Sequence, residues 1–290
     1  MKKLLLILAF SILLVSCAKE ISDPTTLIIA AFNIQWLGDG DDDKVERTDE
    51  DYKRIAKVIG EVDADIMGLQ EIENTAALQK VMKYLPDYYY SVGMQGESQN
   101  LAAIIKKDVN ARIVGEYTPL EVVQNKTRPG LIIEGYKDNF DFYVMVVHFK
   151  STSRYDSTNA MREASIKMRL EQSRVVSDWA DSVISSGSDD DIFIIGDFND
   201  TPVESRYNSL KPLTDNPKLF FENSEMKSCR NASWYVIDHI VSSQTANMRM
   251  LPNSARMYNF FSSYPEDQAE KISDHCPVSV TYDVTAEDND

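Results

Sequence analysis

Residues 191–200 read Asp-Ile-Phe-Ile-Ile-Gly-Asp-Phe-Asn-Asp, and this stretch decides the fold and places the chemistry. The apolar run from Ile192 to Ile195 predicts a short buried strand. Gly196, Asp197 and Asn199 follow at once, and these residue types favour the turn that ends such a strand. The stretch is therefore either a plain turn or a place where a carboxylate and an amide stand at a strand end for chemistry.

Four other apolar runs also end in reactive polar side chains. These ends are Asn33, the pair Gln70-Glu71, the segment His148-Phe149-Lys150-Ser151 and the segment Ser273-Asp274-His275. A further pair, Asp238-His239, lies within a strand-like segment. Because ligands of α/β sheets tend to bind beyond the ends of strands, we expect these side chains to form one shared site.

Strand and helix patterns are mixed along the chain, with several strands in a row, which predicts a layered α/β sandwich rather than a βα barrel. One helix is expected behind Thr48, a plausible N-cap, to about residue 62. Two more are expected over residues 76–85 and 159–184. The expected strands cover residues 27–32, 65–69, 88–92, 102–106, 111–117, 131–136, 142–149, 191–195, 236–241 and 278–282.

The composition is that of an acidic globular protein. The chain has 290 residues, of which 43% are hydrophobic and 26% charged, which excludes wholesale disorder and leaves enough length for a sizeable core. Asp and Glu number 46 against 30 Lys and Arg, for a net charge of −16. This charge disfavours a non-specific polyanion binder, so an enzyme acting on nucleic acid would need metal ions and a local basic patch. The 3 cysteines are too few for a disulfide scaffold.

The N-terminus reads as an export signal. Met1-Lys2-Lys3 precedes an apolar run from Leu4 to Val15, which is too short to span a bilayer as a helix. The run ends Leu14-Val15-Ser16-Cys17, which resembles the bacterial lipobox, so we expect Cys17 to be lipidated; an ordinary signal peptide is the alternative. Cleavage after residue 16 removes Lys2 and Lys3 and no acidic residue, which changes the net charge from −16 to −18.

These features predict the domain organisation. We expect a signal peptide over residues 1–16, a lipidated cysteine and polar tether over residues 17–24, one folded domain over residues 25–284 and an acidic tail over residues 285–290. The lipid anchor would hold the protein at the bacterial cell envelope, on the periplasmic or surface face of the outer membrane.

The polar motifs occur in the order of a known family. Leu69-Gln70-Glu71 and Ser273-Asp274-His275 are weak alone, whereas Gly196-Asp197-Phe198-Asn199 behind a strand is more specific. Together, from Ala31-Phe32-Asn33 to Cys276-Pro277-Val278, they make the chain resemble the endonuclease/exonuclease/phosphatase family, the metal-dependent phosphoesterases related to pancreatic-type deoxyribonuclease. The resemblance covers nearly the whole mature chain and implies a four-layer α/β sandwich, with two packed mixed sheets flanked by helices.

The resemblance implies a metal site built from oxygen ligands. Phosphodiester cleavage needs a hard cation, and Mg²⁺ prefers carboxylate oxygens and retained waters. Glu71 is then the expected primary ligand, with Asn33 and Asp274 around the same ion. Mn²⁺ and Ca²⁺ are the alternative ions. Taken alone, Glu71 reads as a solvated acid at a strand end.

The resemblance also implies roles for a histidine pair and its neighbours. It pairs His275 with Asp238, an acid on a neighbouring strand that would fix the tautomer of the imidazole and raise its basicity. His275 would contact the scissile phosphate or activate water, and Asp197 is the other candidate for polarising that water. Asn199 would donate its amide N–H to the phosphate. His148 would serve the phosphate as a hydrogen-bond donor or as a general acid at the leaving oxygen, although a lone strand histidine is more often structural.

Basic side chains suggest where the phosphate binds. Arg128, in a loop before Pro129, and Lys150 are the expected phosphate-binding cations. Lys150 also opens the chain's sustained basic stretch, which is either a track for a phosphate backbone or a solvated helix face and continues with Arg154, Arg162, Lys167, Arg169 and Arg174. His239 is expected to face away from the site, because side chains alternate along a strand and Asp238 faces it.

Two features leave alternatives open. Once Cys17 is lipidated, Cys229 and Cys276 either form a disulfide or stay as buried free thiols, and we favour free thiols because the sequence gives no distance between them. The acidic run Asp39 to Asp43 looks like a Ca²⁺ loop but lacks the spacing and final Glu of an EF-hand. We interpret it as a solvated loop or one beside Asn33.

The combined prediction is an exported, lipid-anchored, monomeric Mg²⁺-dependent phosphodiester hydrolase that uses in-line attack by water. Nucleic acid, with DNA favoured, is the leading substrate. The first alternative is a phosphatase or phosphodiesterase of small substrates such as nucleotides, inositol phosphates or phospholipid head groups. The second is a surface-binding lipoprotein with the same fold and no catalysis. The mature charge favours small substrates, whereas the basic stretch behind His148 favours nucleic acid.

Overall fold

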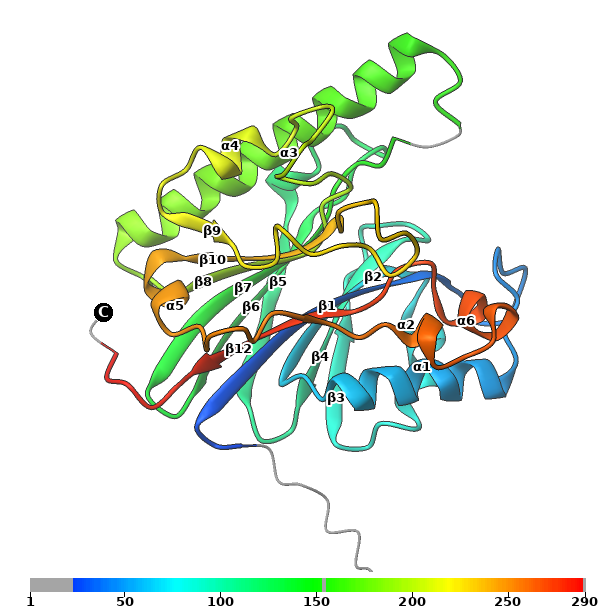
Figure 1. Cartoon of the computed structure of the whole chain (residues 1–290), viewed down its shortest axis with the longest axis horizontal. Helices are drawn as coiled ribbons and strands as arrows, with labels where there is room; N and C mark the ends of the chain where they lie inside the picture. The colour runs from blue at the N-terminus through cyan, green and yellow to red at the C-terminus, as the bar shows by residue number, and fades with distance from the viewer. Residues whose placement is uncertain (1–22, 153–154, 289–290) are drawn as a thin grey trace, which may run out of the picture.

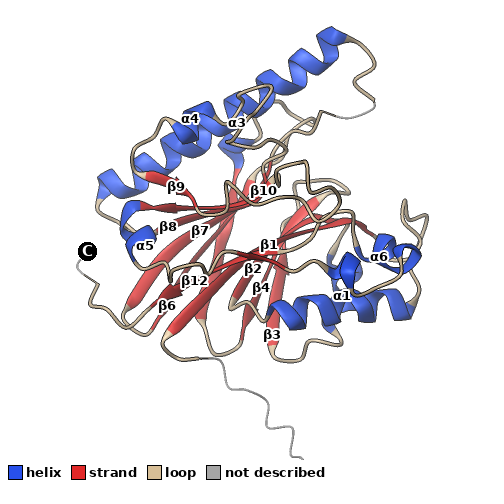
Figure 2. Ribbon diagram, viewed as in Figure 1, coloured by secondary structure: helices blue, strands red, loops and turns tan. Residues whose placement is uncertain are grey.

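Two six-stranded mixed β-sheets pack face to face, and helices cover the outer face of each sheet (Figure 1, Figure 2). The structure is a computed structural model that describes residues 23–152 and 155–288. The layers run helix, sheet, sheet, helix, so the predicted four-layer α/β sandwich is confirmed. The expected signal peptide, residues 1–16, and Cys17 lie outside the described residues.

The first sheet contains the N-terminal and C-terminal strands of the domain. Its order is β11 (Arg256–Met257), β12 (Val278–Asp283), β1 (Thr26–Leu37), β2 (Ile66–Ile72), β4 (Asn100–Lys106) and β3 (Tyr88–Val92). Its outer face packs against α1 (Asp49–Val62), α2 (Thr75–Met82) and α6 (Glu266–Ile272), with the short 3-10 helix η2 (Phe260–Ser262) beside them.

The second sheet is built from the middle of the chain. Its order is β5 (Asn110–Tyr117), β6 (Gly130–Lys137), β7 (Phe140–His148), β8 (Ile192–Asp197), β10 (Asp238–Ser243) and β9 (Leu219–Phe221). Its outer face is covered by the long helix α3 (Asn159–Ser186), by α4 (Lys211–Thr214) and by the 3-10 helix η1 (Thr118–Leu120), while α5 (Gln244–Met248) follows β10. Figure 1 shows the N-terminal half of α3 running past the ends of the strands.

The inner faces of the two sheets share one apolar core, and the sheets approach closely at Gly68. A Cβ atom at this position of β2 would lie 2.8 Å from Cγ1 of Val146 on β7. Protein interiors are packed at near-crystalline density, so a side chain at this point would force the sheets apart. Local signals also fix the helices: Thr48 and Asp51 form a capping box at the start of α1, and Thr158 caps α3.

The strand pairing brings the predicted functional residues to one edge of the sandwich. β1 and β2 are parallel, with Asn33 opposite Gln70, and β7 and β8 are parallel, with His148 opposite Asp197. Parallel neighbours end at the same edge of a sheet, so both pairs deliver their polar ends there. β10 runs antiparallel to β8 and begins at that edge, with Asp238 opposite Asp197.

Several expected elements differ in extent. β1 continues to Leu37 through an irregularity behind Asn33, because Gln35 and Trp36 adopt left-handed backbone angles that shift the register. β10 begins at Asp238 rather than at residue 236. The helices α4, α5 and α6 and the strands β9 and β11 were not predicted, because they are short and carry little periodic signal. Within the described residues, no helix is both long and apolar enough to cross a membrane.

Candidate active site

Six side chains from separate strand ends meet where the two sheets share an edge. The Asn33 amide nitrogen lies 3.3 Å from Oε1 of Glu71 and 3.1 Å from Oδ2 of Asp197, and so joins the first sheet to the second. Nε2 of His148 lies 3.5 Å from the same Asp197 oxygen. Ligand atoms of Asp197, Asp238 and His275 all lie within 4.8 Å of one another. The single shared site expected from the strand ends is therefore present.

An irregular turn behind Asn33 holds Glu71 in place. Gln35 and Trp36 have φ values of 37° and 53°, and Glu71 itself has a φ of 63°, so three non-glycine residues in the left-handed region lie together. The Trp36 backbone N–H donates to Oε2 of Glu71 at 3.0 Å, and the Gln35 N–H donates to Oδ1 of Asn33 at 2.9 Å. Left-handed backbone at non-glycine residues costs free energy, and such strain concentrates at functional sites.

Arg47, which the sequence analysis missed, supports this turn from behind. Its guanidinium is buried and donates to the backbone carbonyls of Ile34, Gln35 and Trp36 at 3.0, 2.8 and 2.8 Å. It also donates to the carbonyl of Lys271 at 2.7 Å, near the end of α6. The arginine thus ties the segment that carries Asn33 to the segment that leads into His275. Backbone carbonyls leave no residue-type signal, so this contact could not be predicted from the sequence.

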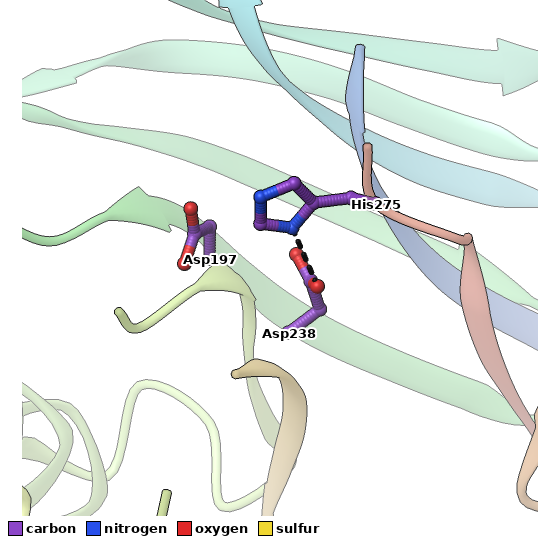
Figure 3. A group of neighbouring side chains, drawn as sticks. All are labelled: Asp197, Asp238 and His275. Carbon is purple, nitrogen blue, oxygen red and sulfur yellow. Dashed lines mark hydrogen bonds and ion pairs between the residues drawn. The ribbon is translucent and has the colours of Figure 1, made fainter. Parts of the chain in front are cut away.

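The His275 imidazole lies between the carboxylates of Asp197 and Asp238 (Figure 3). Nδ1 of His275 lies 2.8 Å from Oδ2 of Asp238, so the pair expected from the family resemblance is in hydrogen-bond contact. Burial lowers the pKa of His275, but the charge and hydrogen bond of Asp238 raise it more, and the pKa stands well above its usual value. His275 is therefore a cation at neutral pH as the site stands.

Asp197 carries the opposite perturbation. Burial raises the pKa of Asp197 to about 7; the nearby His275 lowers it, while Asp238 and Glu71 raise it further. Asn199 steadies this carboxylate, because its backbone N–H donates to Oδ1 at 2.8 Å and its side-chain amide donates to Oδ2 at 3.0 Å. A carboxylate with a pKa near 7 is well matched to accept a proton at neutral pH.

Arg128 sets the tautomer of His148. A guanidinium nitrogen of Arg128 contacts Nδ1 of His148. Because Arg can only donate, Nδ1 must be the unprotonated nitrogen that accepts. The proton of the neutral ring is then on Nε2, which faces Asp197 and Glu71. Burial and the positive charge of Arg128 lower the pKa of His148 well below its usual value. A neutral imidazole suits the hydrogen-bond donor role better than the general-acid role.

Lys150 and Asp274 lie on opposite flanks of this cluster. Lys150 lines a cavity together with Arg128, and burial lowers the pKa of its ammonium. Asp274 has a half-exposed side chain and lies beside His275, with Oδ1 3.9 Å from Nε2 of the ring. The structure thus places Asp274 next to the imidazole, while Asn33 and Glu71, the other two expected metal ligands, contact each other near Asp197.

The donor set fits a hard divalent cation. Asp197 and Asp238 are buried carboxylates, Glu71 is partly buried beside Asp197, and Mg²⁺ prefers such oxygens. Within the described part of the chain, Oδ1 of Asp238 is a buried oxygen without a hydrogen-bond partner. Several carboxylates this close repel one another, and a bound cation would offset that repulsion. A second acidic group consists of Asp39 and Asp43, in the loop behind β1 that the sequence suggested, and of Glu73, which follows β2.

Two expectations about neighbouring residues can be compared with the structure. His239 is fully buried and contacts Asn223 and the carbonyl of Asp200, so it faces away from the site as expected. In the basic stretch, Arg169 is fully buried and bonds the carbonyl of Lys150, while the exposed Arg174 pairs with Glu171 and Asp178. Neither is free to follow a phosphate backbone. Arg154 lies outside the described residues.

The preference for free thiols was wrong. Cys229 and Cys276 form a disulfide, with their Cα atoms 6.3 Å apart and a sequence separation of 47. Cys276 follows His275 directly, and Cys229 lies in the loop that leads into Asp238. The bond therefore joins the two segments that carry the imidazole and its carboxylate partner. The sequence could not show this because it gave no distance between the two cysteines.

Comparisons with known proteins bear on the family and the fold. A model of the Endonuclease/Exonuclease/phosphatase family matches residues 30–275. Among curated proteins, no sequence matches the chain. The solved structures it resembles include truncated TDP2 from Caenorhabditis elegans, with 15% identity, a TM-score of 0.63, and coverage of 89% of this chain and 97% of that one.

Two other similar structures are the mannosyl-6-phosphatase of Bacteroides thetaiotaomicron and the human Nocturnin catalytic domain with a bound sulfate anion. The first has 18% identity and a TM-score of 0.58, and the match covers 88% of this chain and 98% of that one. The second has 14% identity and a TM-score of 0.62, and the match covers 89% and 94%. At these identities the likeness concerns the fold.

We expect Asp197→Asn to stabilise the fold at alkaline pH. The pKa of Asp197 is about 7 in the folded protein and 3.8 in an ordinary aspartate. The protonated carboxyl group therefore stabilises the folded state fully below pH 4, and this stabilisation is lost as the pH rises through 7. In urea unfolding with EDTA present, the variant should have a free energy of unfolding higher than that of the native protein by roughly 1–3 kcal/mol at pH 8.5 and by less at pH 5.5. The exposed Asp178→Asn is the control. Equal gains at both pH values would contradict the assignment.

We expect Arg47→Lys to destabilise the protein although it keeps the positive charge. An ammonium cannot reproduce the planar set of donors, so some of the carbonyls it now serves would lose their partners. The free energy of unfolding in urea should fall by about 2–3 kcal/mol. Hydrogen exchange should quicken at residues 34–36. Arg174→Lys, at an exposed and ion-paired position on α3, should change neither reading. Unchanged exchange in Arg47→Lys would refute the proposed support of the turn.

Proposed function

The chain belongs to the Endonuclease/Exonuclease/phosphatase family of metal-dependent phosphoesterases, and from this premise we propose that it hydrolyses phosphodiester bonds in DNA. The observation that carries the proposal is the arrangement of Asp197, Asp238 and His275 beside Glu71 and Asn33. It places a proton acceptor, a cationic donor and oxygen ligands for a metal around one point.

The chain's own residues divide the work of hydrolysis. Asp197, with its pKa near 7, accepts a proton from the attacking water. The water oxygen then bonds to phosphorus while the ester P–O bond breaks, and the leaving oxygen takes up a proton from solvent. His275, held as a cation by Asp238, donates to the phosphoryl oxygens as negative charge develops there. Glu71 and Asn33 would hold a divalent ion, which would supply Lewis-acid stabilisation of the same charge.

The opposite flank binds the phosphate. Nε2–H of the neutral His148 and the guanidinium of Arg128 are adjacent, so both can donate toward a phosphate next to Asp197. Arg128 reaches Oε1 of Gln99 at 3.0 Å through its other terminal nitrogen, which fixes its plane. Lys150, which lines the neighbouring cavity, adds a second cation to this flank, and the Asn199 amide supports Asp197 and thereby the position of the water.

Small phosphate esters are the second candidate substrate class. The net charge of −16 opposes long polyanions, and Arg169 and Arg174 are engaged in contacts of their own. A structural neighbour is described as a mannosyl-6-phosphatase. Salt separates the two classes, because binding of a polymer weakens steeply with salt and binding of a small ester weakens less.

We expect residues 18–290 to nick supercoiled plasmid in Mg²⁺ and to stop in EDTA. His275→Ala and Asp238→Asn should each lower the rate at least about 100-fold, because one removes the cation and the other its partner. The exposed Asp178→Asn should match the native protein. Nicking that persists in EDTA would exclude the metal-dependent mechanism. If the plasmid stays intact while a small activated phosphodiester is hydrolysed, DNA is excluded as the substrate and small phosphate esters become the proposed substrate class.

We propose separately that the protein is an exported lipoprotein anchored through Cys17. The supporting features are the two lysines, the apolar run and the sequence Leu14-Val15-Ser16-Cys17. Acyl chains on Cys17 would hold the enzyme at the cell envelope, where extracellular nucleic acid is available as a nutrient. The domain itself is expected to act as a monomer.

When the full chain is expressed in a bacterium, we expect it in the membrane fraction and labelled by a radioactive or clickable fatty acid. Cys17→Ser should abolish the label and release the protein from the membrane, because no other cysteine precedes the folded domain. Cys229→Ser should keep the label. Labelling that survives in Cys17→Ser would disprove the anchor.

A further inference from the structure

The buried face of α3 is polar in the part of the helix that contacts the chain behind β7. A helix that covers a sheet normally buries an apolar stripe, because buried polar groups cost free energy unless they are hydrogen-bonded. In α3 the buried apolar residues, Val176, Trp179 and Ala180, lie in the C-terminal half. The buried residues before them all have polar or charged side chains, and these are Ser165, Arg169, Gln172 and Ser173.

Two of these side chains hold both backbone groups of Lys150. The Lys150 backbone N–H donates to Oε1 of Gln172 at 2.8 Å, and Nη1 of Arg169 donates to the Lys150 carbonyl at 2.6 Å. The same Nη1 lies 3.3 Å from Oγ1 of Thr152. Arg169 and Gln172 are three residues apart, so they project from the same face of the helix. Helix α3 therefore fixes the chain just after it leaves β7.

Arg169 also joins this segment to the one behind β8. Its Nε donates to Oγ of Ser209 at 2.7 Å, and that hydroxyl donates to Oδ2 of Asp200 at 2.5 Å. Asp200 ends the stretch Gly-Asp-Phe-Asn-Asp, which also contains Asp197. The guanidinium thus bonds one segment that follows the metal-site carboxylate and one that carries Lys150, so it sets the position of each relative to the other.

The Lys150 ammonium depends on this backbone support. Lys150 lines the cavity beside Arg128, where burial lowers the pKa of the ammonium and the charges of Arg128 and Arg169 lower it further. A lysine side chain is a point charge on a flexible stem, so its direction depends on how its backbone is held. Repulsion by Arg128 would turn a loosely held ammonium away from the phosphate flank.

We propose that Arg169 and Gln172 are positioning residues for the phosphodiesterase reaction. They hold the backbone of Lys150 so that its ammonium stays beside Arg128 and donates to the substrate phosphate. Both side chains are fully buried and bonded to Lys150, so they act through it and not on the substrate. Burial of a charged group seldom adds to stability, so Arg169 is better explained by what it holds in place. This inference rests on the proposed function, in which Lys150 binds phosphate.

Two substitutions remove the support of Lys150 in different ways. Arg169→Lys keeps the charge and loses the planar set of donors, whereas Gln172→Met keeps the length of the side chain and loses the acceptor for the Lys150 N–H. Arg174→Lys is the matched control, because Arg174 is exposed on the same helix and pairs with Glu171 and Asp178. Thermal unfolding shows which variants are folded, and Gln172→Met carries the test if Arg169→Lys does not fold.

The kinetic measurement uses bis(p-nitrophenyl) phosphate in Mg²⁺. Arg169→Lys and Gln172→Met should each raise KM at least about fivefold and change kcat less than about twofold, because they weaken phosphate binding through Lys150. In a Lys150→Ala background the same substitutions should change KM less than about twofold, because the side chain that they position is gone. Arg174→Lys should match the native protein. Equal effects in the two backgrounds would overturn the proposal, because a general loss of structure does not depend on Lys150.

Binding of inorganic phosphate separates this inference from the proposed function. If the native protein hydrolyses no phosphodiester, the proposed function fails, and the Kd of inorganic phosphate, measured by calorimetry, replaces KM in the same comparison. Arg169→Lys and Gln172→Met should then raise this Kd at least about fivefold when Lys150 is present and leave it nearly unchanged in the Lys150→Ala background. The positioning role is refuted if both variants bind phosphate as the native protein does, or if the native protein binds none.

Discussion

The site depends on one electrostatic constraint, which is that carboxylates are buried next to one another at the shared edge of two sheets. Asp197 is almost fully buried, Asp238 nearly so, and Glu71 lies beside them with a small exposed fraction. Ionised groups this close destabilise one another unless charges and hydrogen bonds compensate. The protein compensates with the His275 cation, the Arg128 guanidinium and the amides of Asn33 and Asn199. Burial raises the pKa of Asp197, and the neighbouring carboxylates of Asp238 and Glu71 also raise it; the same gathering of negative charge suits the site to a cation.

Holding these groups in place requires supports that do no chemistry themselves. The left-handed turn at Gln35 and Trp36 points a backbone N–H at Glu71, and Arg47 bonds the carbonyls of that turn from the other side. The disulfide between Cys229 and Cys276 fixes the segments of Asp238 and His275 to each other. The hydrogen bonds of Arg47 and the disulfide both act on the segment of His275. Arg47 donates to the carbonyl of Lys271 shortly before His275, and Cys276 follows it directly. Positional precision within fractions of an ångström is what proton transfer demands.

The fold class and most of the candidate site residues could be predicted from the sequence, because both depend on local patterns. An apolar run that ends in an acid or amide, as at Ile195 and Asp197, marks a strand end, and parallel strands bring such ends to one edge. The turn at Gln35 and Trp36 was not predictable, because neither residue type signals a left-handed backbone. Arg47 and the disulfide were missed for a different reason. They join positions far apart in sequence, and such distances exist only once the chain has folded.

Charged residues are distributed unevenly on the two sides of the site. The chain as a whole is strongly acidic, yet four cations and three acids line the cavity beside Arg128, whereas five acids and three cations line the cavity beside Asp274. A negatively charged phosphate ester therefore meets a more favourable potential on the Arg128 side of the site than on the Asp274 side.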